Sequence, residues 1–475
     1  MEVDTNTRAI PKVPKGWKAK FSERKNKFFY INRETSETQW DLPQGVEVSK
    51  SKKKREELAV KKPKKLDDNI AITGLSQGQP QGQLKVCTRE ELPLKQIEFV
   101  TDTLSCGPLV THEPLAPLVP MVTREPMVTR EPLAPFENSD IAQHYSSVAQ
   151  DKSQQSRQDR KDSPTSRLHS IHNWIKGVLV GCGTGVWGEK ASIYVMDLAC
   201  GRGGDLFKWD KTTKNNRQTI SMYMGVDIAY GAIAEAERRS SHLHFPHRFE
   251  CADLSKESDL TQVASLSRPN SFHVVSMQFA LHYFFNREES IHRLFSFMAS
   301  SLQPGGIFLC SYADGATIVR KLRDRQWNIH KETGRSPQDV VVSNPFYKIE
   351  ISKQTLDDLE ASPSPFGHAY RFTLEGAVRA QREYLVPDDV LTTIGHHYGF
   401  KTIVVSNMQP FIKDVMKVDK HGHNMRYLRV FGGLSEIPLD EWECSSLYKV
   451  RIMVFDPHHN REAVAKSWIL KYLFG

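Results

Sequence analysis

Short apolar runs alternate with amphipathic stretches from residue 139 to residue 475. The runs are rich in Val, Ile and Met, and they predict strands at Ser192–Leu198, Met222–Asp227, Phe272–Met277 and Gly306–Ser311. Apolar residues recur with helical spacing between them, which predicts helices that include Tyr230–Arg239 and Glu288–Leu302. Because the strand runs are nearly continuous in their apolar character, each strand is expected to be buried on both faces. The pattern therefore predicts an α/β fold with a parallel sheet between two layers of helices.

Residues before 139 follow a different pattern and separate into two zones. Residues 10–45 contain three short β-like runs and two tryptophans, Trp17 and Trp40, and we interpret them as one small all-β domain. Residues 46–138 are first charged and then rich in Pro, Gln and Thr, with near-duplicate segments such as MVTREP between Leu109 and Pro135. Because prolines at this density prevent helices and strand ladders, this zone is predicted to be a disordered linker to the domain at 139–475.

The positive charge of the chain is concentrated in one segment. The formal net charge is +8, and a dense basic block, SKSKKKREELAVKKPKK, runs from Ser49 to Lys65. Such a block is either a solvated tether or a signal for nuclear import with a salt-sensitive grip on RNA phosphates, and the two interpretations are compatible. It leads us to expect a nuclear protein.

The composition argues against several classes of protein. The seven cysteines are odd in number and form no C-x-x-C pair, so neither a disulfide framework nor a zinc site is indicated, and no metal is expected. No apolar run approaches the ~20 residues that span a bilayer, and the first residues lack the apolar stretch of a secretory signal. We therefore expect a protein of a reducing compartment without a membrane partner.

The segment from VPKGW to QWDLP resembles a WW domain. The resemblance implies that the small core and its turn are built by Trp17, Tyr30, Asn32 and Pro43. It also implies that Phe29 and Trp40 form a groove that clasps a proline-rich peptide in its preformed polyproline conformation. Two positions depart from the family, because Phe29 stands where a tyrosine is usual and Arg33 where a histidine is usual.

The first loop of this segment, Ser22–Lys27, carries three cations. We hypothesise that Arg24, Lys25 and Lys27 hold a phosphorylated Ser-Pro ligand, such as the tail of RNA polymerase II. The alternative is an ordinary basic loop.

A glycine-rich turn follows the first strand of the α/β region, in the stretch VMDLACGRGGDLFKW. Its spacing is not G-x-G-x-x-G, because Ala199 occupies the first glycine position, and no Walker lysine follows. Two acids stand at the ends of the next strands, Asp227 and Asp253. Ligands of such folds bind beyond the carboxyl ends of the strands, where a carboxylate can accept hydrogen bonds from ribose hydroxyls or an adenine amine. Together these residues predict a cofactor that contains a nucleoside.

From His144 onward the chain resembles the cellular mRNA cap guanine-N7 methyltransferases. The segments that carry the resemblance are HNWIKGVL, DLACGRGGDLFKW, SMQFALHYFF, LQPGG, FGHAYRFTLEGAV and EWECSSLY. It implies the class I, Rossmann-like fold of S-adenosylmethionine-dependent methyltransferases. The residues that would contact S-adenosylmethionine are Lys176, Ala199, Gly201, Asp227, Asp253, Gln278 and Tyr283. Ala199 departs from the family's glycine, and its methyl group is expected to crowd the methionine moiety slightly.

The same resemblance implies a site for the capped 5′ end of mRNA. Its residues would be His172, Asn173, Arg202, Lys208, Arg239, His282, Glu375 and Tyr448. Arg202, Lys208 and Arg239 suit the triphosphate bridge, which is dense in negative charge. Glu375 would accept hydrogen bonds from the guanine N1–H and amine, and would position the base together with His282 and Tyr283.

No acid–base catalyst is expected, because guanine N7 already has an available lone pair. Positioning and electrostatics would then carry the reaction. Two alternatives remain at this point. One is a methyltransferase for another RNA position or a small molecule, and the other is a non-catalytic adaptor whose WW domain recruits partners. The polar stretch Arg323–Val341 receives no role.

Overall fold

The computed structural model describes residues 17–22, 27–32, 38–39, 139–359, 361–427, 437–458 and 460–475. The predicted linker at 46–138 and its basic block lie outside these residues, as do Trp40 and Pro43 of the WW-like segment. Its loop cations Arg24 and Lys25, as well as Arg33, are also outside them. The chain divides into two compact units, which are described separately.

The smaller unit is a three-stranded antiparallel sheet. Its strands are β1 (Trp17–Ser22), β2 (Lys27–Asn32) and β3 (Thr38–Gln39), with β2 in the centre. Tyr30 of β2 pairs with Ala19 on one side and Gln39 on the other, and its side chain is buried as predicted. The backbone of Phe29 lies on β2, whereas its side chain is outside the described part of the chain.

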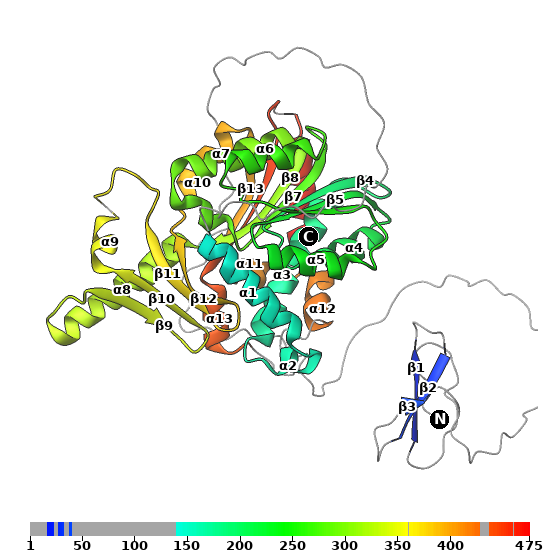
Figure 1. Cartoon of the computed structure of the whole chain (residues 1–475), viewed down its shortest axis with the longest axis horizontal. Helices are drawn as coiled ribbons and strands as arrows, with labels where there is room; N and C mark the ends of the chain where they lie inside the picture. Colours follow the sequence, from blue (N-terminus) through cyan, green and yellow to red (C-terminus); the bar gives the residue numbers. More distant parts are fainter. Residues whose placement is uncertain are drawn as a thin grey trace, which may run out of the picture. The chain divides into compact units, whose positions relative to one another are not determined.

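A seven-stranded sheet organises the larger unit (Figure 1). Its strands are β4 (Ser192–Leu198), β5 (Thr219–Asp227), β6 (His247–Cys251), β7 (Phe272–Gln278), β8 (Leu302–Ala313), β13 (Phe400–Asn407) and β14 (Tyr448–Phe455). Their order is β13-β14-β8-β7-β4-β5-β6. The four predicted strands are confirmed as β4, β5, β7 and β8, and these are parallel to their neighbours within β6-β5-β4-β7-β8. This is the sheet of the Rossmann-like methyltransferase fold.

One strand breaks the parallel arrangement. β14 runs antiparallel to both β8 and β13, so the sheet is mixed at this strand and parallel from β6 to β8. An interior strand is apolar whichever way it runs, and its hydrophobic pattern therefore does not reveal its direction.

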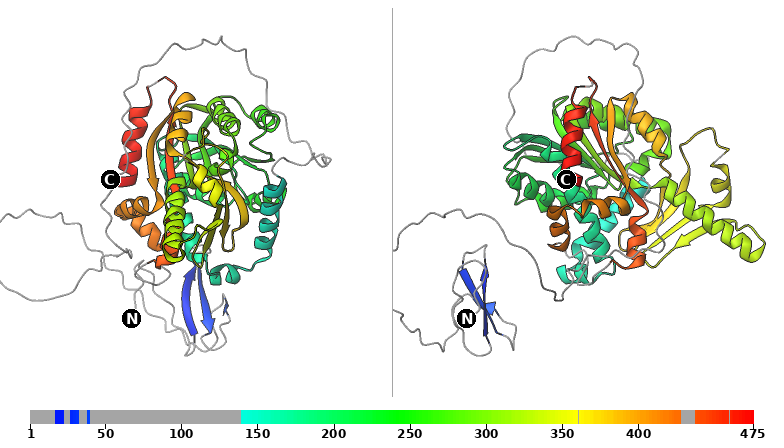
Figure 2. Two further views of the ribbon diagram at one scale, coloured as in Figure 1. Left: turned by 90° about the vertical axis from the view of Figure 1, so that its left-hand side faces the viewer. Right: turned by 180° about the vertical axis from the view of Figure 1, so that it is seen from behind.

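Helices cover both faces of the sheet. One core cluster contains residues of α3 (Ser166–Gly185), α4 (Leu206–Asn215), α5 (Tyr230–Ser240), α11 (Met408–Val415) and α14 (Glu462–Phe474). The other contains residues of α6 (Glu257–Ser265), α7 (Glu288–Ser301) and α10 (Asp388–His397). Successive residues of β4 alternate between the clusters, with Val195 in the first and Met196 in the second. Figure 2 shows α14, in red, packed along β13 and β14.

An antiparallel sheet is inserted after β8. Its strands are β9 (Asp339–Ser343), β10 (Tyr347–Ser352), β11 (Ala369–Leu374) and β12 (Val378–Tyr384), in the order β12-β11-β10-β9. Helix α8 (Gly315–Thr333) precedes it and packs on β9, and the short α9 (Lys353–Asp358) follows β10 (Figure 1). The stretch Arg323–Val341, to which the sequence analysis assigned no role, forms the end of α8 and the start of β9.

The remaining elements frame the ends of the strands. They are α1 (Ser139–Gln154), α2 (Arg157–Asp162), the 3-10 helix η2 (Leu281–Asn286), α12 (Asp419–Tyr427) and α13 (Leu439–Ser445). Helix α1 packs on α5, and η2 packs on β12 and β8. Among the described helices, none combines the length and the apolar character needed to cross a membrane.

Candidate active site

A cavity of about 670 Å³ lies at the carboxyl ends of β4, β5 and β7. Small-molecule sites typically have volumes of roughly 300–1,000 Å³, so the cavity is large enough for a ligand. The predicted site residues that line it are His172, Asn173, Lys176, Ala199, Gly201, Arg202, Asp227, Arg239, Asp253, Gln278, His282, Tyr283 and Tyr448. Two predicted site residues, Lys208 and Glu375, are not among its lining residues.

The glycine-rich loop after β4 is tied to the end of β5 by one carboxylate. Asp227 accepts hydrogen bonds from the backbone N–H groups of Gly201, at 2.7 Å, and Ala229, at 2.9 Å. Burial raises the pKa of Asp227, and these backbone donors partly oppose that rise. Gly201 has φ 53°, and a Cβ atom built on it would meet nothing within 4 Å. The loop therefore leaves open space beside a buried carboxylate.

Ala199 begins this loop in a left-handed backbone conformation, with φ 54°. An L-residue with a side chain pays about 1–2 kcal/mol for that conformation, which glycine adopts freely. The consequence of alanine at this position is therefore backbone strain, in addition to the expected crowding by its methyl group.

The ends of β6 and β7 contribute two further polar side chains. Asp253 is buried, and its Oδ1 accepts from the Ser255 N–H at 3.0 Å and from its hydroxyl at 2.7 Å. The Gln278 amide donates to Ser276 Oγ at 3.2 Å and accepts from the Ser311 hydroxyl at 2.9 Å. Both side chains are thus held in fixed orientations beside the cavity.

These features fit a nucleoside-containing cofactor. The cofactor would be held at the open turn of Gly201 and by the carboxylates of Asp227 and Asp253, which line the cavity. A carboxylate can accept more than two hydrogen bonds. They lie beyond the carboxyl ends of adjacent parallel strands, where such folds bind nucleotides.

Three aromatic rings meet at another part of the cavity wall. Phe279 lies with its ring centroid 4.7 Å from that of His172 and 5.0 Å from that of Tyr448. Phe279 has φ 61°, which is unusual for a bulky residue, and its N–H donates to the Ser311 carbonyl at 2.8 Å. The sequence analysis missed Phe279, although it lies two residues after the predicted strand at Phe272–Met277, where such folds present ligand-binding residues.

A buried carboxylate faces a buried histidine in the same cavity. Glu383 of β12 is 3% exposed, and its Oε2 accepts from the Tyr370 hydroxyl at 2.7 Å. Its Oε1 lies 3.4 Å from His282 Nε2. Within the described residues, neither ring nitrogen of His282 has a hydrogen-bond partner, although the side chain is buried. Buried polar atoms are rarely unpaired, so this pair is expected to bind a ligand.

Glu383 takes the place in the cavity that the sequence analysis assigned to Glu375. Glu375 is exposed in the turn between β11 and β12, and its N–H donates to the Phe346 carbonyl at 2.9 Å. Its neighbours Leu374 and Gly376 line the cavity, while its own side chain does not. The placement of Glu375 was therefore wrong. An acid within the largely apolar run EYLV was the available signal for Glu383.

Cations gather where α1 and α3 border the cavity. Burial, followed by the charges of Arg202 and Lys176, lowers the pKa of Lys152 to about 8. Burial likewise lowers the pKa of His169 to about 4 and that of His172 to about 3, so both imidazoles are neutral at physiological pH. Among the described residues, no carboxylate forms an ion pair with Lys152. The sequence analysis did not identify Lys152 or His169, because neither lies in a segment that carries the family resemblance.

Lys208 lies behind this cluster and not on the cavity wall. Its ammonium is 2.8 Å from Asp205 Oδ1, which also pairs with Lys176 at 2.9 Å. Burial alone would raise the pKa of Asp205, but the two lysines outweigh it and hold that pKa low. Lys208 is therefore paired with Asp205 and does not line the cavity, and its contact with the cap stays a prediction.

Comparison with known proteins follows the same division of the chain. Residues 133–456 match the mRNA (guanine-N(7))-methyltransferase domain, and residues 13–43 match the WW domain. The mRNA cap guanine-N(7) methyltransferase 1 of Arabidopsis thaliana is 31% identical over 322 residues, which cover 65% of this chain and 79% of that protein. The mRNA cap guanine-N(7) methyltransferase of Schizosaccharomyces pombe is 30% identical over 269 residues, which cover 55% of this chain and 66% of that protein. The chain therefore belongs to the mRNA (guanine-N(7))-methyltransferase family and carries a WW domain near its N-terminus.

Proposed function

We propose that the cavity binds S-adenosylmethionine along the ends of β4, β5 and β6, and binds the guanine of an mRNA cap beside Glu383, His282 and Tyr448. The enzyme class and the cofactor are those of the family. The assignment of residues rests on one observation. Glu383 and His282 are buried side by side in the cavity wall, and neither ring nitrogen of His282 has a hydrogen-bond partner among the described residues.

Guanine recognition follows from the acceptor at Glu383. One carboxylate can accept hydrogen bonds from the N1–H and the exocyclic amine of guanine, and adenine does not present both donors on that edge. The Tyr370 hydroxyl occupies Oε2 of Glu383 and fixes the orientation of the carboxylate. Phe279 and Tyr448 supply aromatic surface for the base. A site that leaves a buried acceptor unpaired with the wrong base discriminates strongly against it.

The chemistry needs no general base, because the N7 lone pair of guanine is already available. When bound, the cofactor supplies a methyl group on a positively charged sulfonium. The protein's part is to align the base and to stabilise the positive charge that develops on it. The carboxylate of Glu383 favours that charge. The neutral imidazole of His172 adds no opposing charge, because its pKa is about 3.

The cluster of cations fits the triphosphate of the cap. Lys152, Arg202 and Arg239 all line the cavity, and phosphate oxygens are the partners that Lys and Arg prefer. Burial, followed by the charges of Arg202 and Lys176, lowers the pKa of Lys152, and a bound anion would offset both effects.

Two tyrosines close the cavity beside η2. The hydroxyls of Tyr145 on α1 and Tyr283 on η2 are 2.8 Å apart, and burial raises the pKa of Tyr283 well above its usual value. Both phenols are therefore neutral. They join α1 to the wall that carries His282, and they shape the space between cofactor and base.

A transfer assay with isotopically labelled S-adenosylmethionine tests the proposal. RNA that begins with GpppG should accept the label at guanine N7, and RNA that begins with ApppG should not. Asp227→Ala should abolish labelling and weaken S-adenosylhomocysteine binding. Equal labelling of both RNAs, or label at an internal position, would contradict the proposal.

We infer that the WW domain recruits the enzyme to a proline-rich ligand, for which the phosphorylated tail of RNA polymerase II is our candidate. The three-stranded sheet and the match at residues 13–43 support a peptide-binding module of this kind. Fluorescence polarisation with the full chain and matched Ser-Pro peptides, with and without phosphate, tests the ligand. Equal affinity for both peptides would reject the role of phosphate.

We also propose a nuclear location, supported by the basic block Ser49–Lys65. Imaging of a tagged chain with this block removed tests the proposed location.

A further inference from the structure

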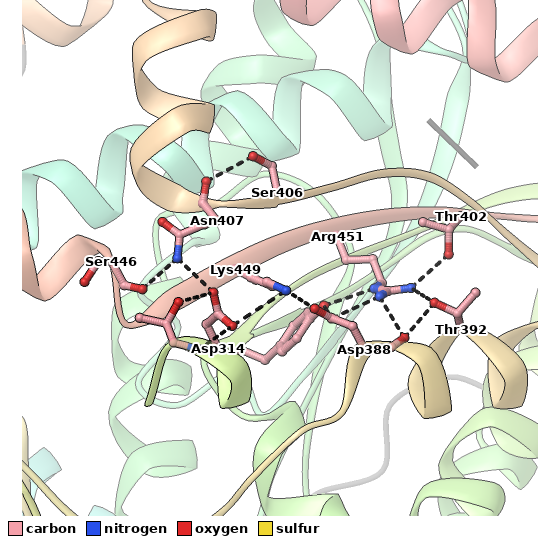
Figure 3. A network of polar contacts seen from close by, with 11 residues as sticks. Asp314, Asp388, Thr392, Thr402, Ser406, Asn407, Ser446, Lys449 and Arg451 are labelled. Atoms are coloured by element: carbon pink, nitrogen blue, oxygen red, sulfur yellow. Dashed lines mark hydrogen bonds and ion pairs between the residues drawn. The ribbon is translucent and has the colours of Figure 1, made fainter. Parts of the chain in front are cut away.

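A network of buried and half-buried charged side chains includes Lys449, the residue after Tyr448 (Figure 3). Its five central side chains are listed in chain order: Asp314, Asp388, Asn407, Lys449 and Arg451. They come from the end of β8, the start of α10, the end of β13 and the strand β14. None of the five is among the residues that line the cavity. Any effect on the ligand must therefore act through other side chains.

Arg451 anchors the network in the core. Arg451 is 1% exposed. Its guanidinium donates hydrogen bonds to the hydroxyls of Tyr312, Thr392 and Thr402. It also donates to the carboxylate and to the backbone carbonyl of Asp388. The Tyr312 hydroxyl in turn donates to Asp388 at 2.6 Å. Asp388 is thus held from the core side by two donors, independently of Lys449.

Lys449 bridges two carboxylates. Its ammonium pairs with Asp388 and lies 3.6 Å from Asp314 Oδ1, so one cation stands between two acids, as Figure 3 shows. Asp314 is itself buried and accepts from the Thr317 N–H at the start of α8 and from Asn407 Nδ2 at 2.9 Å. Two cations and two anions balance within the network, as burial requires.

The segments joined by this ion pair carry the two ends of the guanine site. Lys449 follows Tyr448 directly, and the chain before Tyr448 is held by Asn407, which donates to the Ser446 carbonyl at 2.6 Å. Asp388 lies shortly after Glu383, where the chain passes from β12 into α10. The inserted sheet supplies Glu383 and the central sheet supplies Tyr448. The bridge between Lys449 and Asp388 therefore ties the first residue of α10, shortly after the inserted sheet ends, to the central strand that carries Tyr448.

We infer that the Lys449–Asp388 ion pair is a positioning element that sets the placement of Glu383 relative to Tyr448 and thereby the selectivity of the site for the guanine cap. The inference rests on the proposed function of the cavity. A small misplacement of groups that must contact one planar base is costly even when the groups themselves remain. The cofactor end of the cavity is built on β4, β5 and β6 and lies outside this bridge.

The test substitutes Lys449→Met in the full chain and measures three quantities. The Kd for GpppG should rise about tenfold, and the preference for GpppG over ApppG should fall, because Glu383 and Tyr448 lose their fixed spacing. The Kd for S-adenosylhomocysteine should stay within twofold. Lys449→Arg, which keeps the charge, should restore most of the GpppG affinity.

Lys417→Met is the matched control. It makes the same Lys-to-Met change, but at the exposed Lys417, which forms an ion pair with Asp414. It should leave all three quantities unchanged. Unchanged GpppG affinity and preference in Lys449→Met would overturn the inference, as would an equal loss of affinity for GpppG and S-adenosylhomocysteine. If the unsubstituted protein itself shows no preference for GpppG, the proposed function fails instead, and the two failures are thus distinguishable.

Discussion

Glu383 Oε1 and His282 Nε2 lie 3.4 Å apart, although Glu383 lies on strand β12 and His282 on the 3-10 helix η2. Glu383 belongs to the inserted sheet, whereas His282 follows the central strand β7. The part of the cavity that we propose for guanine lies where these two parts of the fold meet.

Substitution of Glu383 should impair use of the cap specifically. Glu383→Gln keeps the size of the side chain but removes the charge and one acceptor. The loss of a charge-assisted hydrogen bond to the base costs about 2 kcal/mol, so kcat/KM for GpppG-capped RNA should fall roughly 30-fold. Steady-state kinetics measure this. Glu375→Gln is the matched control, because Glu375 is exposed, and it should change kcat/KM less than twofold. The reverse ranking of the two variants would refute the assignment.

Cap binding should weaken as the pH rises through about 8. The pKa of Lys152 is about 8 in the free protein, so its ammonium carries a charge below that pH and loses the charge above it. A bound triphosphate favours the charged form, and KM for capped RNA should therefore increase between pH 7 and pH 9. Lys152→Met should raise KM about fivefold at pH 7 and reduce the pH dependence. Lys152→Arg should keep the low KM at both pH values, because a guanidinium stays charged. A pH profile of Lys152→Met that parallels the unsubstituted enzyme would exclude Lys152 as the titrating group.

Replacement of Ala199 by glycine should stabilise the loop after β4. Ala199 has φ 54°, and glycine removes a strain of about 1–2 kcal/mol, offset by roughly 0.4–1 kcal/mol of extra entropy in the unfolded chain. Scanning calorimetry without ligand should show a small rise in Tm for Ala199→Gly. Ala234→Gly, on an exposed face inside α5, is the control and should lower Tm, since glycine costs about 1 kcal/mol in a helix. A fall in Tm for both variants would show that the left-handed conformation stores no strain.

Ionisation of Asp197 should lower the free energy of unfolding as the pH rises. Burial, followed by the charge of Asp205, raises the pKa of Asp197 to about 7, whereas the Tyr223 hydroxyl lowers it by donating at 2.7 Å. Because the folded-state pKa is above the unfolded one, the protonated carboxyl favours folding below about pH 4, and that contribution is lost as the pH rises through about 7.

The shift corresponds to at most about 4 kcal/mol in the free energy of unfolding, and coupling to Asp205 reduces what is realised. Asp197→Asn remains neutral, so its urea-unfolding free energy should exceed that of the unsubstituted protein at pH 8. The two should be similar below about pH 4. Parallel pH dependences for the two proteins would contradict this account.

Local patterns were sufficient for much of the central sheet. The predicted strand Ser192–Leu198 has the same bounds as β4, and the predicted helix Tyr230–Arg239 differs from α5 by one residue. Continuous apolar runs and helical spacing are properties of neighbouring residues, so the sequence alone can show them. The same applies to Asp227 and Asp253, because a residue at the end of a parallel strand reaches the ligand-binding edge of the sheet wherever the strand lies.

The tertiary structure decided everything that depends on where distant segments meet. Whether Glu375 or Glu383 faces the cavity depends on the turn between β11 and β12 and on contact with His282, which sequence spacing does not encode. Arg451 is an ordinary cation in the sequence, yet it is buried because acceptors from β8, α10 and β13 converge on it. Lys152 has a perturbed pKa only because α1 folds beside Arg202 and Lys176. Periodicity determines which residues share a face of one element, whereas burial and electrostatic energy arise from the several elements that enclose a group.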